Sequence, residues 1–197
     1  MEKLFVSANN SLNEKRHKTS FLALRYGNVV GSSGSVIPKF IKMINEGKKI
    51  TITDSEMTRF SITMEQALDF IIDCTQNGKP SEIYVPKLKS YSIMDVKDAL
   101  FDLLGKTDFN VVGIRPGEKL HETLINSEEI RNSWDIQNKF MISNPIRNDD
   151  EIIQSYDNQI KKITDIDKYS SKIATHHSKN ELIEIIKKSN LLNHKDD

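Results

Sequence analysis

Apolar and polar positions follow two patterns along this chain: short unbroken apolar runs, and longer stretches in which apolar residues recur at helical spacing. The runs predict strands at residues 21–26, 50–53, 82–85 and 110–114, because a strand covered on both faces needs no polar side. Helical spacing predicts helices at residues 36–46, 63–76, 92–104 and 178–192. Strands that alternate with helices in this order predict an α/β fold.

Capping residues support these helix boundaries. Ser35 precedes the first helix, and Ser92 precedes the third with an aspartate three residues later. Thr63 with Gln66 and Ser178 with Glu181 have the spacing of a capping box. Glycines follow the first three helices, as expected at helix C-termini.

Three other segments carry less regular patterns. Residues 1–10 resemble the end of a helix, because Leu4, Phe5 and Ala8 share one face and no capping residue precedes them. Residues 54–60 predict a polar loop. Residues 144–165 have the composition of an excursion or linker. No strand is predicted in these segments, and only the first is expected to be helical.

Charge and composition narrow the possible functions. The chain has 197 residues, with 28 basic and 28 acidic side chains, so it lacks the excess positive charge that nucleic-acid binding requires. No apolar stretch approaches the roughly 20 residues of a membrane span, and no signal-peptide pattern is present. The single cysteine, Cys74, excludes an internal disulfide framework and a cysteine-based zinc site. The sequence predicts a soluble cytoplasmic protein with no nucleic-acid partner and no membrane span.

Three polar loops directly follow predicted strands, where open α/β sheets bind ligands. They span residues 28–35, 53–59 and 115–119. Arginines in the second and third loops suit bidentate phosphate contacts, and the amides that open the helix at residue 36 suit an anion. Glu118 could accept hydrogen bonds from a ribose diol, so together the loops fit a nucleotide diphosphate. Taken alone, Arg59 favours a surface ion pair, and Gly117 is consistent with a simple turn.

The remaining polar residues favour structural roles. The carboxylates of residues 65, 69 and 73 are typical of a solvated helix face rather than a metal site. His176 and His177 lie in a polar loop and are expected to be solvated. His121 could act as a general base, but a supporting or surface role is favoured. Trp134 is expected to anchor the C-terminal segment, and Cys74 to be a small buried hydrophobe.

Four sequence blocks carry a resemblance to a known family. They are residues 24–38 (LRYGNVVGSSGSVIP), 53–54 (TD), 57–60 (MTRF) and 114–122 (IRPGEKLHE). In order and spacing these blocks resemble the inverting UDP-N-acetylglucosamine 4,6-dehydratases, which are extended short-chain dehydrogenase/reductases. Such enzymes act in bacterial surface-polysaccharide and pseudaminic acid biosynthesis. The resemblance covers about residues 2–141.

The resemblance implies that this chain is the C-terminal part of such an enzyme. The family's glycine-rich NADP loop and catalytic residues are then expected upstream of Met1, and no strand here is followed by such a loop. The implied fold is the C-terminal part of a doubly wound Rossmann sheet plus a small α/β substrate-binding subdomain. Residues 1–35 are expected to be the remnant of the dinucleotide-binding domain. Residues 36–143 are expected to be the substrate-binding region, and residues 144–197 a polar extension with a terminal helix.

The resemblance also implies roles for individual residues. Substrate-binding positions that carry over are Asn28, Ile37, Thr53, Arg59, Arg115 and Glu118. Val29 carries over as a cofactor-binding position, whereas no catalytic or metal-binding residue is expected in this chain. Ser33 replaces an arginine that the family usually has, which puts cofactor affinity or subunit assembly in doubt.

The expected substrate is UDP-N-acetylglucosamine and the expected cofactor is NADP, bound mainly outside this chain. The chain alone is expected to be inactive as a dehydratase. Expected partners are a separately encoded N-terminal half and further copies of the intact enzyme. Three alternatives remain open: a non-catalytic nucleotide-sugar binding module, a non-functional remnant, and part of a UDP-sugar 4-epimerase.

Overall fold

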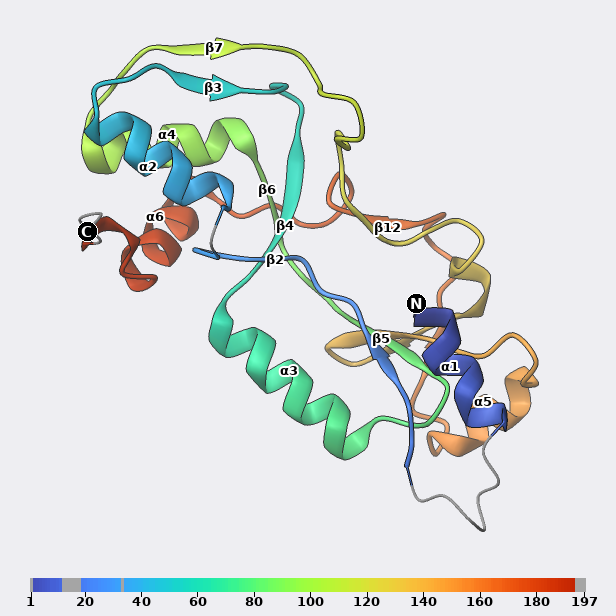
Figure 1. The fold of residues 1–197 in the computed structure, drawn as a ribbon. Helices are drawn as coiled ribbons and strands as arrows, with labels where there is room; N and C mark the ends of the chain where they lie inside the picture. The colour runs from blue at the N-terminus through green and yellow to red at the C-terminus, as the bar shows by residue number, and fades with distance from the viewer. Residues whose placement is uncertain (1, 12–18, 33, 194–197) are drawn as a thin grey trace. The chain divides into compact units, whose positions relative to one another are not determined.

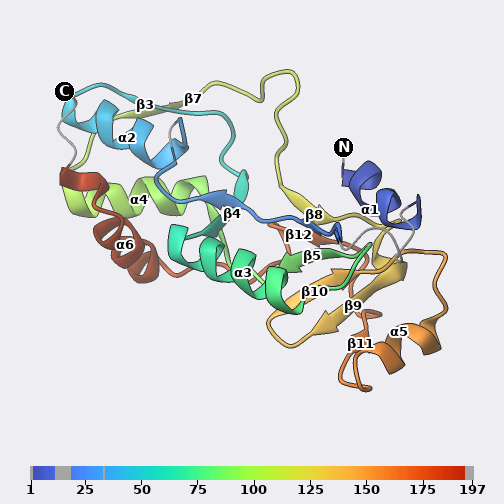
Figure 2. The same cartoon turned by 60° about the horizontal axis from the view of Figure 1, so that its bottom comes forward.

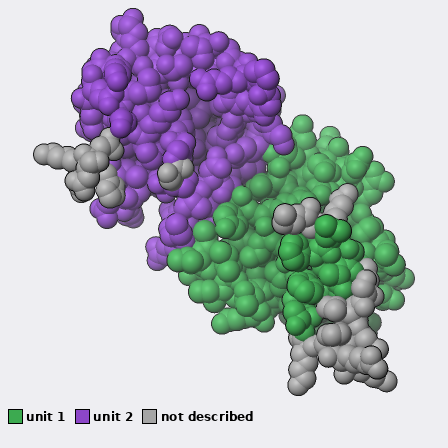
Figure 3. All heavy atoms as spheres, viewed as in Figure 1, with its two compact units in different colours: residues 1–26, 67–87, 123–169 green, residues 27–66, 88–122, 170–197 purple. Residues whose placement is uncertain are grey.

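The chain folds into two compact units, each assembled from three separate segments. The computed structural model describes residues 2–11, 19–32 and 34–193 (Figure 1). Unit 1 comprises residues 1–26, 67–87 and 123–169, and unit 2 comprises residues 27–66, 88–122 and 170–197 (Figure 3). Within the described ranges, every helix is too short or too polar to cross a membrane.

Unit 1 is built on a five-stranded sheet with the order β1-β5-β10-β9-β11. Its strands are β1 (Ala23–Leu24), β5 (Ile83–Pro86), β10 (Lys139–Ile142), β9 (Ser133–Ile136) and β11 (Lys161–Lys162). Four of these strands, β5, β10, β9 and β11, are labelled in Figure 2. β1 pairs in parallel with β5, and the other neighbours pair antiparallel. The sheet therefore combines both pairing modes, as mixed α/β folds do.

Helices and short connections complete unit 1. They are α1 (Glu2–Ser11), α3 (Met64–Asn77, whose first turn belongs to unit 2), β8 (Thr123–Ile125), the 3-10 helix η1 (Ile130–Asn132) and α5 (Asp149–Ser155). Trp134 and Cys74 are buried together in the core beside Ile152 of α5. The burial predicted for Cys74 is confirmed, and the contact of Trp134 with Ile152 fits the anchoring role expected for this tryptophan.

Unit 2 contains two small sheets covered by helices. β2 (Asn28–Val29), β4 (Thr58–Ile62) and β6 (Ser90–Ser92) form one sheet, in which β2 is parallel and β6 antiparallel to β4. β3 (Ile50–Ile52) pairs in parallel with β7 (Phe109–Val111). The helices are α2 (Val36–Asn45), α4 (Ile93–Leu104), α6 (Lys179–Lys188) and the 3-10 helix η2 (Leu191–Asn193). The chain enters its last segment through β12 (Tyr169–Ser170).

The α/β class and the helix starts are confirmed. Thr63 and Gln66 exchange reciprocal side-chain to backbone hydrogen bonds of 3.2 and 3.0 Å before α3. Ser178 and Glu181 form the predicted capping box of α6. Ser92 accepts a hydrogen bond from a backbone amide in the first turn of α4.

Two predicted irregular segments are regular instead. The predicted loop at residues 54–60 is wrong in its second half, because Thr58 and Phe60 are buried and belong to β4. The predicted linker at residues 144–165 contains α5 and β11 and buries Ile152 and Ile163. The expected assignment of roles to residues 1–35, 36–143 and 144–197 stays a prediction.

Candidate functional site

Unit 2 contains a cavity of about 260 Å³ between α2, β3, β6 and the loops that follow its strands. Its walls are apolar at the base, where Phe40, Ile52 and Ile93 come from the core. Polar and charged side chains surround this base. A small apolar pocket with a few convergent polar groups is the usual form of a ligand site.

The three loops predicted to bind a ligand meet at this cavity. The predicted substrate-binding residues that line it are Asn28, Thr53, Arg59, Arg115 and Glu118. They come from β2, from the end of β3, from β4 and from the segment after β7. Residues up to 90 positions apart in sequence therefore share one wall, although only their order and local motifs were visible in the sequence.

Two residues of the predicted set do not line the cavity. Ile37 is 3 % exposed and packs in the hydrophobic core of unit 2, whereas its neighbour Val36 faces the cavity. Val29 pairs with Ile62 in the sheet, and its carbonyl accepts a hydrogen bond from the backbone of Ser32. The binding roles assigned to these two residues stay predictions.

A tight turn holds Arg115 and Glu118 at the cavity. The backbone amide of Glu118 donates to the carbonyl of Arg115 at 3.0 Å, and Gly117 adopts a φ of +85° that side chains disfavour. Thr53 Oγ1 donates to Glu118 Oε1 at 3.3 Å. Within the described part of the chain, the Arg115 guanidinium has no acceptor from the protein. This arginine can therefore engage an anion.

Arg59 lines the cavity while its guanidinium is held by the protein. Nη1 donates to the carbonyls of Thr58 at 2.7 Å and Leu120 at 3.1 Å, and the side chain is 14 % exposed. Its Nε lies 3.8 Å from a carboxylate oxygen of Glu122. Arg59 therefore forms an ion pair, as the alternative interpretation held, but the pair is largely buried and does not lie on the surface.

Glu122 is a site residue that the sequence reasoning missed. Its Oε1 accepts a hydrogen bond from Asn28 Nδ2 at 3.1 Å, and its Oε2 accepts from the backbone amide of Phe60 at 2.8 Å. Burial raises the pKa of this carboxyl above its ordinary value. The Phe60 hydrogen bond and the charge of Arg59 lower the pKa, but they do not cancel the effect of burial. Its position four residues after Glu118, in the same motif, was the available signal.

The N-terminus of α2 adds positive character to the cavity. Ser35 and Val36 line the cavity, and Lys39 lies one turn further along the helix. The buried Ser35 hydroxyl makes no side-chain cap hydrogen bond and has no partner among the described residues. Helix N-terminal amides and an ammonium group favour a bound anion. Lys39 was also missed, although its spacing of four from Ser35 placed it in the first turn.

The histidines contribute to hydrogen bonding in unit 2. His121 Nδ1 lies 2.8 Å from Thr58 Oγ1, which fits the supporting role favoured for it. His177 Nε2 lies 2.7 Å from Ser61 Oγ, and burial lowers its pKa. The expectation that His177 is solvated is therefore wrong, whereas His176 is exposed. Among the residues with described positions, no group of three metal-ligating side chains exists.

Comparison with known proteins finds one matching family and several similar proteins. Residues 1–144 match the family described as polysaccharide biosynthesis protein. The chain is 40 % identical to UDP-N-acetylglucosamine 4,6-dehydratase (inverting) of Campylobacter jejuni over 191 residues, covering 94 % of this chain and 56 % of that protein. It is 35 % identical to UDP-glucose 4-epimerase of Rickettsia rickettsii, covering 72 % of this chain and 41 % of that one.

A solved structure supports the same relationship. The X-ray structure of Pen from Bacillus thuringiensis superposes with a TM-score of 0.79 at 32 % identity, covering 97 % of this chain and 55 % of that one. The chain thus spans a little over half the length of the dehydratase and of Pen. The family match over residues 1–144 assigns this chain to the polysaccharide biosynthesis protein family.

Proposed function

We propose that this chain is the nucleotide-sugar-binding portion of an inverting UDP-N-acetylglucosamine 4,6-dehydratase that acts in bacterial surface-sugar biosynthesis. The observation that carries the proposal is the convergence of Asn28, Thr53, Arg59, Arg115 and Glu118 on one cavity of unit 2. The 40 % identity to a dehydratase of this kind supports it. A lyase reaction in pseudaminic acid or a related pathway is the corresponding activity of the longer protein.

The charges of the cavity suit a nucleoside diphosphate sugar. Arg115 and Lys39 offer free or flexible cations to the diphosphate, and the α2 amides at Val36 offer further donors. Glu118 offers an acceptor for the ribose hydroxyls, and Asn28 a polar contact for the sugar. Such contacts orient the substrate without favouring the transition state over the ground state.

NADP is the implied cofactor, and we propose that it is bound mainly outside this chain. No strand here is followed by a glycine-rich dinucleotide loop, and the Val29 carbonyl is already bonded within the 28–35 loop. We therefore assign no step of hydride or proton transfer to the residues of this chain. We expect the isolated chain to bind substrate but to form no dehydrated product.

The wider biological setting follows from the same proposal. The substrate partner is UDP-N-acetylglucosamine, the compartment is the cytoplasm, and the intact enzyme is a homo-oligomer. A separately encoded N-terminal half would supply the NADP site. A UDP-sugar 4-epimerase is the second candidate, favoured by the 35 % identity to the Rickettsia rickettsii epimerase. A binding module without catalysis and a non-functional remnant are the outcomes left if neither activity can be reconstituted.

Calorimetric titration of UDP-N-acetylglucosamine into the purified chain tests this function. We expect saturable binding that Arg115→Ala weakens about tenfold or more, because a charged hydrogen bond contributes about 1.5–3 kcal/mol. Arg131→Ala, at an exposed position of unit 1 outside the cavity, is the matched control and should bind like the wild type. A folded chain that shows no saturation, or an Arg115→Ala variant with unchanged affinity, would refute the proposal. Product formation by the chain with NADP alone would refute its expected inactivity.

A further inference from the structure

The Glu122 carboxylate holds two of the polar side chains that line the cavity, although its own side chain is not part of the lining. It accepts from Asn28 Nδ2 at 3.1 Å through Oε1, and that same oxygen lies 3.8 Å from Arg59 Nε. Oε2 accepts from the backbone amide of Phe60 on β4. The Glu122 side chain is 24 % exposed, so water competes only partly for these contacts.

The chemistry of this contact fixes which atom of Asn28 faces outward. An ionised carboxylate can only accept hydrogen bonds, so it selects the NH₂ group of the Asn28 amide and leaves Oδ1 available. Asn28 is exposed and lines the cavity. We propose that Glu122 is a positioning residue that holds Asn28 with its Oδ1 as an acceptor, so that the cavity selects a ligand bearing an N–H or O–H donor at that point. This inference rests on the proposed function and deepens it.

A purely structural role for the carboxylate is the alternative, and the backbone contacts argue against it. The Glu122 amide donates to Ser171 Oγ at 2.9 Å, and the Glu122 carbonyl accepts from the Ser171 amide at 2.8 Å. Leu120 also accepts from the Thr58 amide at 3.1 Å. These bonds attach the segment to its neighbours without the carboxylate. The fold should therefore tolerate a neutral isostere at position 122.

The orientation of Asn28 should also depend on pH. Arg59 of β4, Tyr91 of β6, and Lys119 and His121 of its own segment are the titratable or charged groups around the Glu122 carboxyl. Burial outweighs the cations and raises the carboxyl pKa, so protonation occurs at a higher pH than for an exposed glutamate. A protonated carboxyl can donate, and the selection of the Asn28 NH₂ group is then lost.

An exchange of amide and carboxylate tests this inference by calorimetry with UDP-N-acetylglucosamine. Glu122→Gln alone and Asn28→Asp alone should each weaken binding about tenfold. The double variant should bind within about threefold of the wild type, because the amide at 122 then donates to the carboxylate at 28 and leaves an acceptor facing the cavity. Glu56→Gln makes the same chemical change at an exposed site outside the cavity and should have no effect.

The outcomes separate this inference from the function on which it rests. The positioning role would be overturned if the losses of the two single variants added up in the double variant. It would also be overturned if Glu122→Gln bound the ligand as tightly as the wild type. In both cases the proposed binding itself would stand. Wild-type affinity should fall as the pH is lowered through the raised Glu122 pKa, and Glu122→Gln should lack that fall. A wild-type affinity that does not change with pH would also overturn the inference. This measurement uses only the wild-type chain, so it does not depend on whether a variant folds. No binding by the wild type would refute the proposed function and the inference together.

Discussion

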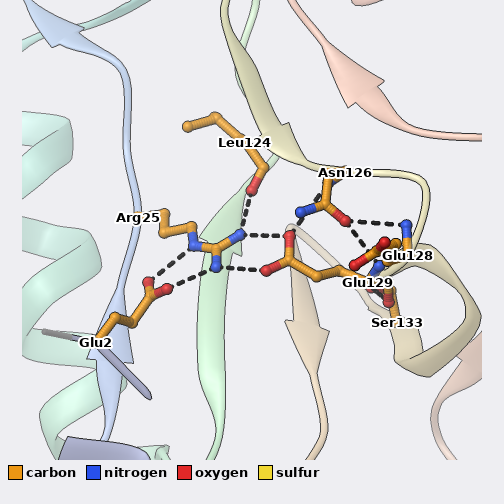
Figure 4. A network of polar contacts seen from close by, with 7 residues as sticks. All are labelled: Glu2, Arg25, Leu124, Asn126, Glu128, Glu129 and Ser133. Atoms are coloured by element: carbon orange, nitrogen blue, oxygen red, sulfur yellow. Dashed lines mark hydrogen bonds and ion pairs between the residues drawn. The ribbon is translucent and has the colours of Figure 1, made fainter. Parts of the chain in front are cut away.

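Replacement of Arg25 should destabilise unit 1 more than an ordinary surface ion pair would suggest. Its guanidinium uses all five N–H groups (Figure 4). Nε and Nη2 bind Glu2 at 2.8 and 2.6 Å, and Nη1 and Nη2 bind Glu129 at 2.8 and 2.7 Å. Nη1 also donates to the Leu124 carbonyl at 2.8 Å. One side chain therefore connects α1, the end of β1 and the segment after β8.

The burial of this network sets the expected magnitude. The exposed fractions of the Arg25, Glu2 and Glu129 side chains are 21, 30 and 20 %, between the exposed and fully buried cases. Exposed pairs contribute about 0–1 kcal/mol, whereas the loss of one partner from a buried pair costs about 3–5 kcal/mol. We expect Arg25→Met to cost about 3 kcal/mol, because two carboxylates then face each other without a cation. Arg25→Lys should lower the free energy of unfolding by about 1–2 kcal/mol, since lysine keeps the charge but loses the bidentate contacts with Glu2 and Glu129.

Urea unfolding followed by tryptophan fluorescence measures this effect. Trp134 is the only tryptophan of the chain and lies in the core of unit 1, so its emission reports the unit that contains Arg25. Arg131→Met, at an exposed position of the same unit, should leave the midpoint unchanged. An Arg25→Lys variant as stable as the wild type would show that charge alone, and not the fork geometry, stabilises this region.

The remaining predictions concern tyrosine ionisation and helix capping. Burial raises the pKa of Tyr84 and Tyr156, which donate to the buried Glu82. The unfolded chain therefore releases these protons at lower pH than the folded chain, so stability is retained below about pH 10 and falls above it. Tyr156→Phe should reduce this alkaline loss in urea unfolding, and an unchanged slope against pH would contradict the assignment. Ser92→Ala should lower the free energy of unfolding by about 1 kcal/mol, measured by circular dichroism, and Ser35→Ala by less than about 0.5 kcal/mol. The reason is that only Ser92 makes a side-chain cap hydrogen bond. A larger loss for Ser35→Ala than for Ser92→Ala would refute this reasoning.

Local signals predicted the parts of the fold that local interactions determine. The Thr63–Gln66 and Ser178–Glu181 pairs lie within four residues of each other, so their spacing alone specifies the reciprocal hydrogen bonds. β4 was only partly predictable, because its residues Thr58 and Arg59 look like loop residues in isolation. They become strand residues through pairing with Ser92 and Tyr91, more than 30 positions later.

The segment at residues 144–165 shows the same limit more strongly. Its apolar residues are sparse and lack a helical or alternating period, so its composition resembled a linker. Ile152 is buried in the core that contains Trp134 of β9 and Met141 of β10, and the buried Ile163 donates its backbone amide to the Ser133 carbonyl of β9. Burial here depends on tertiary contacts, which composition and periodicity do not encode.

For the candidate site, motifs predicted the loops, but the cavity depends on how side chains are directed. Ile37 and Val36 are adjacent in the same motif, yet one enters the core and the other lines the cavity, because neighbours on a helix point about 100° apart. Glu122 was missed because it acts through Asn28 and Phe60, which are distant in sequence, and Lys39 was missed because only the fold brings it to the cavity. The spacing of the motif locates their backbone, whereas only the fold shows what they contact.

The proposed function implies that substrate binding can be separated from catalysis in this chain. Every residue that lines the cavity belongs to unit 2, and that unit has its own hydrophobic core and two small sheets. Lys39, Arg59 and Arg115 bring positive charge to the cavity that would offset a diphosphate, while Glu118 accepts a hydrogen bond from the Thr53 hydroxyl. These groups can hold a nucleotide sugar in one orientation, but they supply no hydride acceptor. We therefore expect a chain that binds UDP-N-acetylglucosamine without converting it, and calorimetric binding measured without cofactor tests this expectation.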